Sequence, residues 1–339
     1  VSFSPDGQTL ATASWDNTIK LWRRQGSGFE SSPYKTLAGH TSGIFSVAWS
    51  PDGSMLASAS RDGTVKLWRA DGTQLQTFRG HKNWVFSVSF SPDGQTIASA
   101  SRDRTAKLWS LDGKELKTLN THTAPIFSIS FSPDGSQIAT ASWDGTTKIW
   151  NREGKEILSL QGGQSPVWSA TWHPDGKTVA TTTEDGMIKL WNLKTEDLMA
   201  MRAHGEAVWK AVWSPDGALM ATSSQETTAK IWSQDGRELR SLRGHNASVT
   251  GIAWSPDSSK LVTSSRDLTA KIWNLAGQEI ATLRGHEASV MGISFSPDGQ
   301  MIASASKDKI VKLWKPDGTF IRNLQHTDIV NAISFSRDG

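Results

Sequence analysis

The sequence predicts an all-β protein in which four-stranded antiparallel sheets form the blades of a β-propeller. A strand-like run ends in Lys-Leu-Trp or Lys-Ile-Trp eight times; the first gap is 46 residues and every later gap is 41. Asp-Gly turns divide each unit into short β-type segments, and no helical period appears. A fixed period of this size indicates one supersecondary unit that buries its faces against its neighbours. The repeated tryptophans are Trp22, Trp68, Trp109, Trp150, Trp191, Trp232, Trp273 and Trp314.

The unit at residues 39–78 shows how the four strands of a blade are expected to form. Its segments are rich in apolar, β-branched and small residues, and turn-forming Pro-Asp-Gly or Asp-Gly sequences separate them. The expected strands are residues 44–50, 55–60, 64–68 and 74–78. Antiparallel strands joined by such short turns give one up-and-down sheet per unit.

Composition narrows the classes of function. The 339 residues contain no cysteine, which excludes disulfides, thiolate metal sites and a cysteine nucleophile. No apolar run approaches the roughly 18–20 residues of a membrane span. The net charge of +3 is too small to indicate nucleic acid. The lysine before each Leu/Ile-Trp pair is expected to pack its stem along the blade with its head in solvent. We therefore expect a cytoplasmic protein without a cofactor, a metal, a membrane partner or a specific nucleic acid.

Gly39-His40, Ser60-x-Asp62 and Trp68 recur in register along the whole chain. This pattern resembles the WD-repeat (WD40) β-propeller family, although Arg, Asn, Ser or Lys replaces the aspartate that the family carries after the tryptophan. The Ser-Pro-Asp-Gly turn with the 41-residue period is similar to bacterial, cyanobacterial-type tandem arrays. The expected units of a single propeller are residues 1–38, 39–79, 80–120, 121–161, 162–202, 203–243, 244–284 and 285–325, with 326–339 as the closing inner strand.

The resemblance implies a hydrogen-bonded tetrad of His, Ser or Thr, Asp and Trp in each blade. The expected complete sets are His40-Ser60-Asp62-Trp68, His81-Ser101-Asp103-Trp109, His122-Ser142-Asp144-Trp150, His245-Ser265-Asp267-Trp273, His286-Ser306-Asp308-Trp314 and, across the chain ends, His326-Ser14-Asp16-Trp22. Two units depart from the pattern. Gly163 takes the place of the histidine beside Thr183, Asp185 and Trp191, and Glu226 replaces the aspartate beside His204, Ser224 and Trp232.

A Ser-His-Asp combination also suggests a catalytic triad. A nucleophile and its base are needed once, at one exposed site, whereas this combination recurs in nearly every unit. We therefore interpret the tetrads as structural and predict that the protein is not an enzyme. Histidines on different blades are also too far apart to share a metal ion.

Two blade counts are compatible with the repeat. Residues 329–336 copy the first strand of a unit and follow His326, whereas the N-terminal unit has only a stub at residues 1–3. If residues 329–336 supply the missing inner strand, eight blades close without free edges, and we favour this arrangement. The alternative is a seven-bladed ring at residues 34–314, with flanks from neighbouring repeats and residues 23–33 as a linker between propellers.

Function is expected where the units differ on one face of the ring. Aromatic residues gather there in the second to sixth units, at the start of the first strand and before the turn aspartate, with two arginines beside them. The predicted partner-binding residues are Phe45, Arg61, Trp84, Phe86, Arg102, Phe127, Trp143, Trp168 and Trp209. Aromatic residues and arginine are enriched at interface hot spots. The alternative is that the aromatic residues only pack against the wall of the central channel.

The sequence thus predicts a non-catalytic scaffold that binds a peptide or protein partner near the central channel, where the two arginines suit an acidic ligand. Val1 lies within a repeat and residues 336–339 begin another, so we expect the sequence to be part of a longer polypeptide. The resemblance to bacterial arrays then implies a second function. The ring would be a sensor or autoinhibitory domain of a signalling ATPase, kinase or protease, with other domains of the same polypeptide as its partners.

Overall fold

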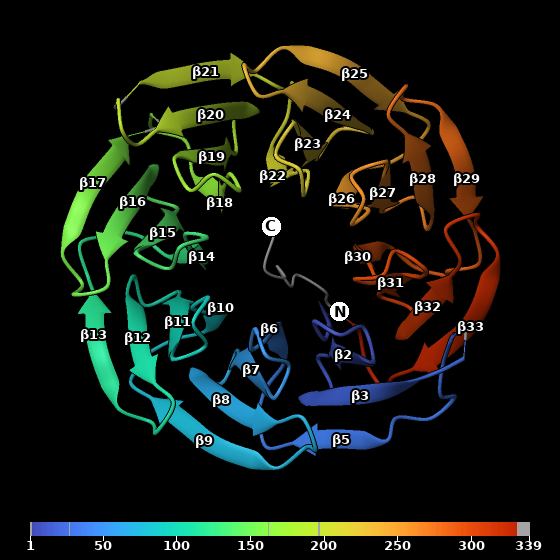
Figure 1. The fold of residues 1–339 in the computed structure, drawn as a ribbon, viewed down its shortest axis with the longest axis horizontal. Coiled ribbons are helices and arrows are strands. Elements are labelled where there is room, and N and C mark those ends of the chain that lie inside the picture. The colour runs from blue at the N-terminus through green and yellow to red at the C-terminus, as the bar shows by residue number, and fades with distance from the viewer. Residues whose placement is uncertain (1, 27, 162, 196, 331–339) are drawn as a thin grey trace.

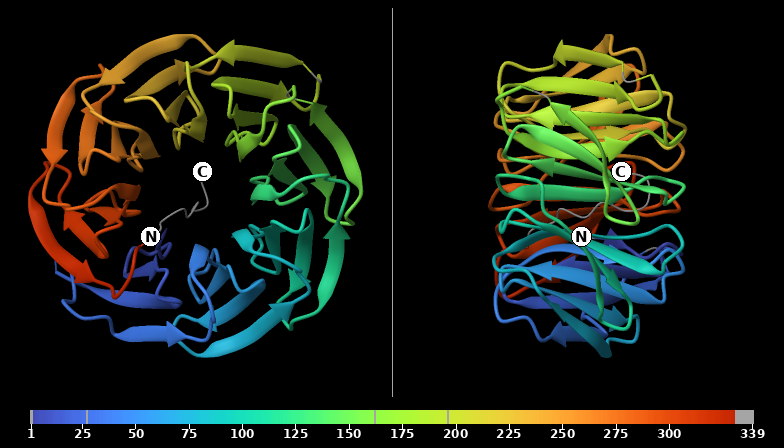
Figure 2. Two further views of the ribbon diagram at one scale, coloured as in Figure 1. Left: turned by 180° about the vertical axis from the view of Figure 1, so that it is seen from behind. Right: turned by 90° about the vertical axis from the view of Figure 1, so that its left-hand side faces the viewer.

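The computed structural model describes residues 2–26, 28–161, 163–195 and 197–330, which form eight antiparallel β-sheets around a central axis (Figure 1). Each sheet is one blade, and its strands follow chain order from the inside of the ring to the outside. Figure 2 shows the same ring from behind and from the side. The predicted eight-bladed all-β propeller is confirmed. The seven-bladed alternative is wrong because residues 2–25 supply three strands of a further blade, and residues 320–325 supply the outer strand of the last one.

The strands agree with the sequence pattern to within a residue or two. The inner strands are β1 (Ser2–Phe3), β6 (Ile44–Trp49), β10 (Val85–Phe90), β14 (Ile126–Phe131), β18 (Val167–Trp172), β22 (Val208–Trp213), β26 (Val249–Trp254) and β30 (Val290–Phe295). The second strands are β2 (Thr9–Ala13), β7 (Met55–Ser60), β11 (Thr96–Ser101), β15 (Gln137–Ser142), β19 (Thr178–Thr183), β23 (Leu219–Ser224), β27 (Lys260–Ser265) and β31 (Ile302–Ser306).

The two outer layers of strands complete the blades. The third strands, which end near the repeated tryptophan, are β3 (Thr18–Gln25), β8 (Thr64–Arg69), β12 (Ala106–Ser110), β16 (Thr146–Asn151), β20 (Met187–Asn192), β24 (Thr228–Ser233), β28 (Ala270–Asn274) and β32 (Ile310–Trp314). The outer strands are β5 (Lys35–Ala38), β9 (Gln74–Arg79), β13 (Glu115–Leu119), β17 (Glu156–Gln161), β21 (Leu198–Arg202), β25 (Glu238–Arg243), β29 (Glu279–Leu283) and β33 (Phe320–Gln325).

The long first gap of the repeat is a hairpin within the first blade. Strand β3 continues to Gln25 and pairs with β4 (Gly28–Phe29) before the chain reaches β5. Phe29 is fully buried, and its ring centroid lies 6.0 Å from that of Phe3. The interpretation of residues 23–33 as a linker between propellers is therefore wrong, because this segment contributes to the core of its own blade.

The hydrophobic core is divided among the junctions between blades. In one cluster, Leu67 and Phe78 of the second blade pack with Val85 and Trp109 of the third. Eight such clusters occur among the described residues, and each joins two neighbouring blades. One of them joins the last blade to the first and contains Leu324. Burial of apolar surface thus holds the ring together all the way round.

The two ends of the chain share the inner strand of the first blade. Val330 forms an antiparallel bridge with Ser14, while Ser2 and Phe3 pair with Ala11 and Leu10. The N-terminal stub noted in the sequence therefore forms β1, and the Val330 bridge places the start of the predicted closing strand beside the same blade. Residues 331–336 lie outside the described part of the chain.

The tetrads form, but with a different hydroxyl from the one predicted. His40 contacts Asp62 through Nδ1 at 2.8 Å and Ser58 through Nε2 at 2.8 Å, and the Trp68 indole donates to Ser58 Oγ at 2.9 Å. Ser60 takes no part. Ser58 and Ser60 share one face of β7, since side chains alternate along a strand. Only Ser58, in the middle of the strand, reaches the indole. Ser60, at the end of the strand, donates to the carbonyl groups of Ser42 and Gly43, which precede the inner strand β6.

The same correction applies in the other blades. In each of these blades the tryptophan indole donates to the hydroxyl two residues before the predicted one. The observed acceptors are Thr12, Ser99, Thr140, Thr181, Thr222, Thr263 and Ser304, in place of Ser14, Ser101, Ser142, Thr183, Ser224, Ser265 and Ser306. The histidine and aspartate of the five predicted sets within single repeats meet at nitrogen-to-oxygen distances of 2.7–2.9 Å. In the set across the chain ends, His326 Nδ1 lies 3.6 Å from Asp16 and has no hydrogen-bond partner among the described residues, so this tetrad is incomplete.

Candidate functional site

Each blade presents two variable side chains next to each other on the face where the inner strands begin. In the second blade the backbone N–H of Arg61 donates to the Gly43 carbonyl at 2.9 Å; in the third, Arg102 donates to Trp84 at 2.8 Å. The residue before the turn aspartate is thereby held beside the entry of the inner strand. Comparable bonds occur in the other blades, from Trp143 to Pro125 for example. The predicted variable positions therefore belong to one continuous surface.

Ser60 and its counterparts support this surface. The Ser60 hydroxyl lies 2.9 Å from the Ser42 carbonyl and 3.1 Å from the Gly43 carbonyl, and it accepts the Asp62 backbone N–H. Ser101 makes the equivalent contacts with Asn83 and Trp84. These hydroxyls thus hold the turn against the inner strand, a role that the sequence analysis had not assigned to them.

The aromatic residues at the start of the inner strands form an unbroken series across five adjacent blades. The ring centroids are 5.3 Å apart for Phe45 and Phe86, 4.8 Å for Phe86 and Phe127, 4.9 Å for Phe127 and Trp168, and 5.3 Å for Trp168 and Trp209. All five side chains are partly exposed. With Trp84 and Trp143 they form the aromatic arc: Phe45, Trp84, Phe86, Phe127, Trp143, Trp168 and Trp209.

Trp143 and Trp168 give the arc its most exposed ring and a buried polar group. The Trp143 side chain is 46% exposed, and its ring contacts Phe127 and Trp168. Trp168 Nε1 is buried and has no hydrogen-bond partner among the described residues. A buried N–H without an acceptor lowers stability.

Arginine side chains lie over the other end of the arc. The guanidinium carbon of Arg61 is 4.4 Å from the Trp84 ring centroid, and that of Arg102 is 4.5 Å away. The nine predicted binding residues are thus connected by direct contacts. Sequence reasoning missed Trp15, whose ring contacts Phe45 and lies 5.8 Å from the Arg61 guanidinium. Trp15 directly precedes the turn residue Asp16, as Arg61 precedes Asp62, and this position in the repeat could have identified it.

The arc ends at the sixth blade, where the chemistry of the inner strands changes. Trp209 Nε1 donates to Ser248 at 3.3 Å, and the next blade carries Thr250 at the equivalent position. Lys210 lies beside Trp209 on β22, where other described inner strands carry serine or glycine. Burial lowers the pKa of Lys210 to about 8. This lysine, too, was missed, although it breaks the repeat.

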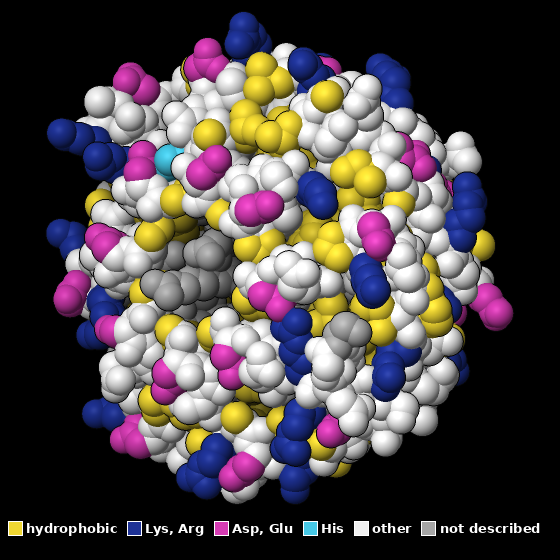
Figure 3. Space-filling view, turned by 45° about the vertical axis from the view of Figure 1, so that its right-hand side comes forward, with side chains coloured by type: hydrophobic (Ala, Val, Ile, Leu, Met, Phe, Trp, Pro, Cys, Tyr) yellow, Lys and Arg dark blue, Asp and Glu magenta, His cyan; other side chains and the backbone are white. Residues whose placement is uncertain are grey.

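Six of the eight repeated lysines bind side chains of the outer strand of their own blade. Lys148 forms an ion pair with Glu156 at 2.9 Å, and Lys271 pairs with Glu279 at 2.7 Å. The expectation of solvated heads is therefore wrong for these lysines, because outer-strand side chains bind them. Over the face visible in Figure 3, charged side chains of both signs are interspersed rather than gathered in one patch.

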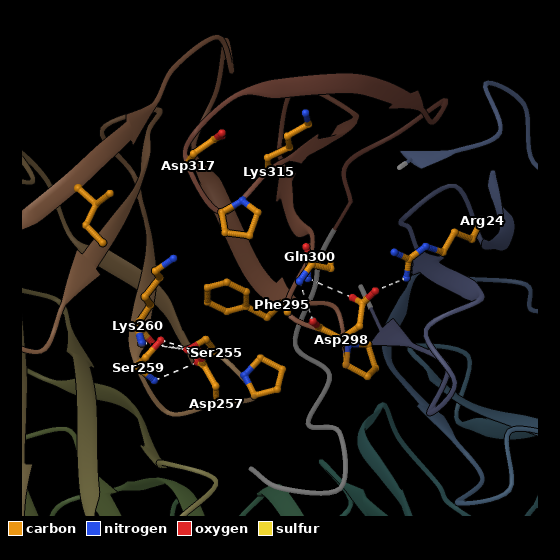
Figure 4. Close-up of a pocket in the computed structure, with 15 residues that line it drawn as sticks. Arg24, Ser255, Asp257, Ser259, Lys260, Phe295, Asp298, Gln300, Lys315 and Asp317 are labelled. Atoms are coloured by element: carbon orange, nitrogen blue, oxygen red, sulfur yellow. Dashed lines mark hydrogen bonds and ion pairs between the residues drawn. The ribbon is translucent and has the colours of Figure 1, made fainter. Parts of the chain in front are cut away.

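A groove of about 790 Å³ lies on the opposite face, where the inner strands end (Figure 4). It is formed by the turns after β26 and β30, and Arg24 of the first blade reaches Asp298 of the last at 2.5 Å. Hydrogen bonds from Ser255 and Ser259 hold the pKa of Asp257 at about 2. The Arg24–Asp298 ion pair at this groove joins the first blade to the last.

The described ranges contain no group of three or more histidine, cysteine, aspartate or glutamate side chains arranged to hold a metal ion. Nor does any helix there have the length and apolar character needed to cross a membrane.

Comparisons with known families agree with this architecture. A family model described as IFT122 first beta-propeller matches residues 69–280, which is more than half of the chain. A second model, described as WD domain, G-beta repeat, matches residues 1–23, 31–69 and 277–315. No curated protein matches the chain significantly.

Proposed function

Because the chain belongs to the WD-repeat β-propeller family, we propose that it is a non-catalytic scaffold that binds an extended peptide or protein loop across the aromatic arc. Propellers of this family are generally protein-interaction scaffolds. The observation that carries the proposal is the unbroken series of ring contacts from Phe45 to Trp209, all at one position of the repeat.

The arc has the chemistry of an interface hot spot. Large, partly exposed rings offer apolar area at low cost in side-chain entropy, and arginine adds directional donors at the rim. The hydroxyl and the imidazole of a tetrad, in contrast, are buried and are not accessible to a ligand. Ser58 is fully buried and the His40 side chain is completely covered, so a substrate cannot reach this pair.

The competing interpretation is that the rings only pack against one another along the channel wall. Aromatic pairs contribute about 0.5–1.5 kcal/mol beyond their buried area, so a purely structural arc would stabilise the ring noticeably. The two interpretations differ in what a substitution changes. A binding role predicts a loss of ligand with little change in stability, whereas a packing role predicts the reverse.

The experiment uses a displayed library of random peptides as the probe. Peptides are selected on the wild-type chain and tested against Trp84→Ala, Phe86→Ala and Trp143→Ala variants. We expect these substitutions to abolish capture and to leave the melting temperature nearly unchanged. The matched control is Phe320→Ala, since Phe320 on β33 is 47% exposed, like Trp143, but lies outside the arc. Capture that survives all three substitutions, or a large loss of stability in each, would refute the proposal.

The second expected function, a sensor or autoinhibitory ring in a larger signalling protein, uses the same surface with a segment of the parent polypeptide as its occupant. The arc variants test this role as well. In a full-length parent they should release the effector from inhibition, while Phe320→Ala should not.

A further inference from the structure

Two guanidinium groups converge on one indole at the junction of the second and third blades. Arg61 and Arg102 come from equivalent turns of these blades, and both lie within 4.5 Å of the Trp84 ring centroid. Trp15 closes the cluster from the side of the first blade. We call Trp15, Arg61, Trp84 and Arg102 the arginine–tryptophan subsite.

The positive charge of this subsite is not compensated by its neighbours. Asp62 and Asp103 follow the two arginines in sequence, but their carboxylates bind His40 and His81 and the backbone N–H groups of Thr41 and Lys82. Within the described residues, no carboxylate lies at ion-pair distance from Arg61 or Arg102. Both side chains are exposed.

The cation–π contacts leave donors of both guanidinium groups available. Arg61 and Arg102 are exposed, and a guanidinium has five N–H donors, so the N–H groups that do not face the indole can bind the two oxygens of a carboxylate. Contact with Trp84 also restricts the arginine side chains, so that less entropy is lost when a ligand binds.

We propose that the arginine–tryptophan subsite binds a carboxylate side chain of the peptide ligand and so fixes its direction on the ring. The proposal rests on the proposed function of the arc and deepens it. The acidic residue of the ligand lies over the first three blades, and apolar residues extend past Phe127 and Trp168 towards Trp209. Charge complementarity selects an aspartate or glutamate, and the series of rings selects the apolar residues.

The test uses individual peptides from the displayed library, labelled and titrated with the full chain. We expect the selected sequences to share an acidic residue at a fixed spacing from apolar residues. The Arg61→Gln/Arg102→Gln variant should bind such a peptide about tenfold or more weakly, as expected for hydrogen bonds to a charged group. A peptide with glutamine in place of the acidic residue should bind the wild type and the double variant equally.

The matched control is Arg266→Gln. Arg266 holds the same turn position in the seventh blade, where its backbone N–H donates to the carbonyl of Ser248, the residue that also accepts from Trp209. Unlike Arg61 and Arg102, it makes no cation–π contact with a ring of the arc among the described residues. This variant should retain wild-type affinity, and the melting temperatures of all variants should agree.

The outcomes separate the two proposals. If no peptide depends on the aromatic arc, the proposed function fails and the subsite fails with it. If peptides depend on the arc but carry no acidic residue, or bind the double variant as tightly as the wild type, only the carboxylate subsite is refuted. Tighter binding of a phosphoserine peptide than of its glutamate counterpart would overturn the assignment to a carboxylate.

Discussion

Ser58 Oγ accepts the indole N–H of Trp68 at 2.9 Å, at a point where both side chains are almost completely buried. The same oxygen lies 2.8 Å from Nε2 of His40. One hydroxyl therefore satisfies two buried nitrogen atoms, and each of them would be costly to leave without a partner.

Ser58→Ala should lower the free energy of unfolding by about 2–4 kcal/mol, because two buried polar groups lose their partner. Ser58→Thr is the matched control and should be nearly neutral, since Thr140 accepts the same two contacts in the fourth blade. Chemical denaturation of both variants measures the difference. Equal stabilities would show that the hydroxyl is not what holds the blade.

The aspartate of the tetrad should matter most where it has a histidine. Asp62 accepts from His40, Thr41 and Thr64, whereas in the fifth blade Gly163 takes the place of the histidine beside Asp185. Asp62→Ala should cost about 2–4 kcal/mol and Asp185→Ala less than half of that. Thermal unfolding of the two variants is the measurement. A larger loss for Asp185→Ala would contradict this account of the tetrad.

The repeat was sufficient to predict the fold because its information is redundant. Eight copies of one strand pattern define a blade, and His326 at the far end of the chain indicates closure. The pattern could not choose between Ser58 and Ser60, since hydroxyl residues recur at both positions and only the distance to the Trp68 indole separates them. It also could not show that Phe29 is buried, because the β3–β4 hairpin has no counterpart in other units.

The candidate site was predictable in outline for the same reason. Positions that vary between units became one surface once the blades were in place. The contact geometry could not be predicted from the sequence. One example is the approach of Arg61 and Arg102 to the same tryptophan, Trp84. Such contacts depend on the rotation between neighbouring blades.

Acid should destabilise the ring in two stages. Burial lowers the pKa of His40, His245, His286 and His326 below 6.5, although the paired carboxylates oppose this shift. At pH values between the lowered folded-state pKa and the ordinary pKa of these histidines, the unfolded chain binds more protons than the folded chain. The contribution of the histidines to the free energy of unfolding is therefore fully present above pH 6.5 and decreases as the pH falls below it.

The second stage comes from the aspartates. Burial raises the pKa of Asp62, but the hydrogen bond from His40 and further donors outweigh it, so the pKa lies well below its usual 3.8. Its contribution is present above pH 3.8 and is lost as the pH falls further. Melting temperatures measured from about pH 8 to pH 3 should show both declines. A stability that is constant between pH 7 and pH 5 would contradict the neutral, buried histidines.

Trp168 offers a substitution that separates binding from stability. Its Nε1 is buried without a partner among the residues described, so Trp168→Phe removes an unsatisfied donor while keeping an aromatic ring. The variant should unfold at the same or a slightly higher temperature. It should also bind arc-dependent peptides more weakly if a ligand oxygen accepts this N–H, which titration with a labelled peptide measures. An unchanged affinity would exclude the donor from recognition.

The junction between the last blade and the first should be the place where the ring opens, because β33 and the first blade are joined only by non-covalent contacts. His326 lies 2.7 Å from Thr12, and Asp16 binds the Thr327 hydroxyl at 2.9 Å. Arg24 and Asp298 close the opposite face at 2.5 Å. Hydrogen exchange followed by mass spectrometry can locate such an opening.

His326→Ala should speed exchange in β2, β3 and β33 by about tenfold or more and leave the blades across the ring, from β14 to β21, nearly unchanged. The matched control is His286→Ala, which removes an equally buried imidazole bonded to Ser304 within one continuous blade. Its effect should stay in the eighth blade without freeing β2. Uniform acceleration over all eight blades in His326→Ala would show that the ring unfolds as one unit and that its closure is no weaker than any other junction.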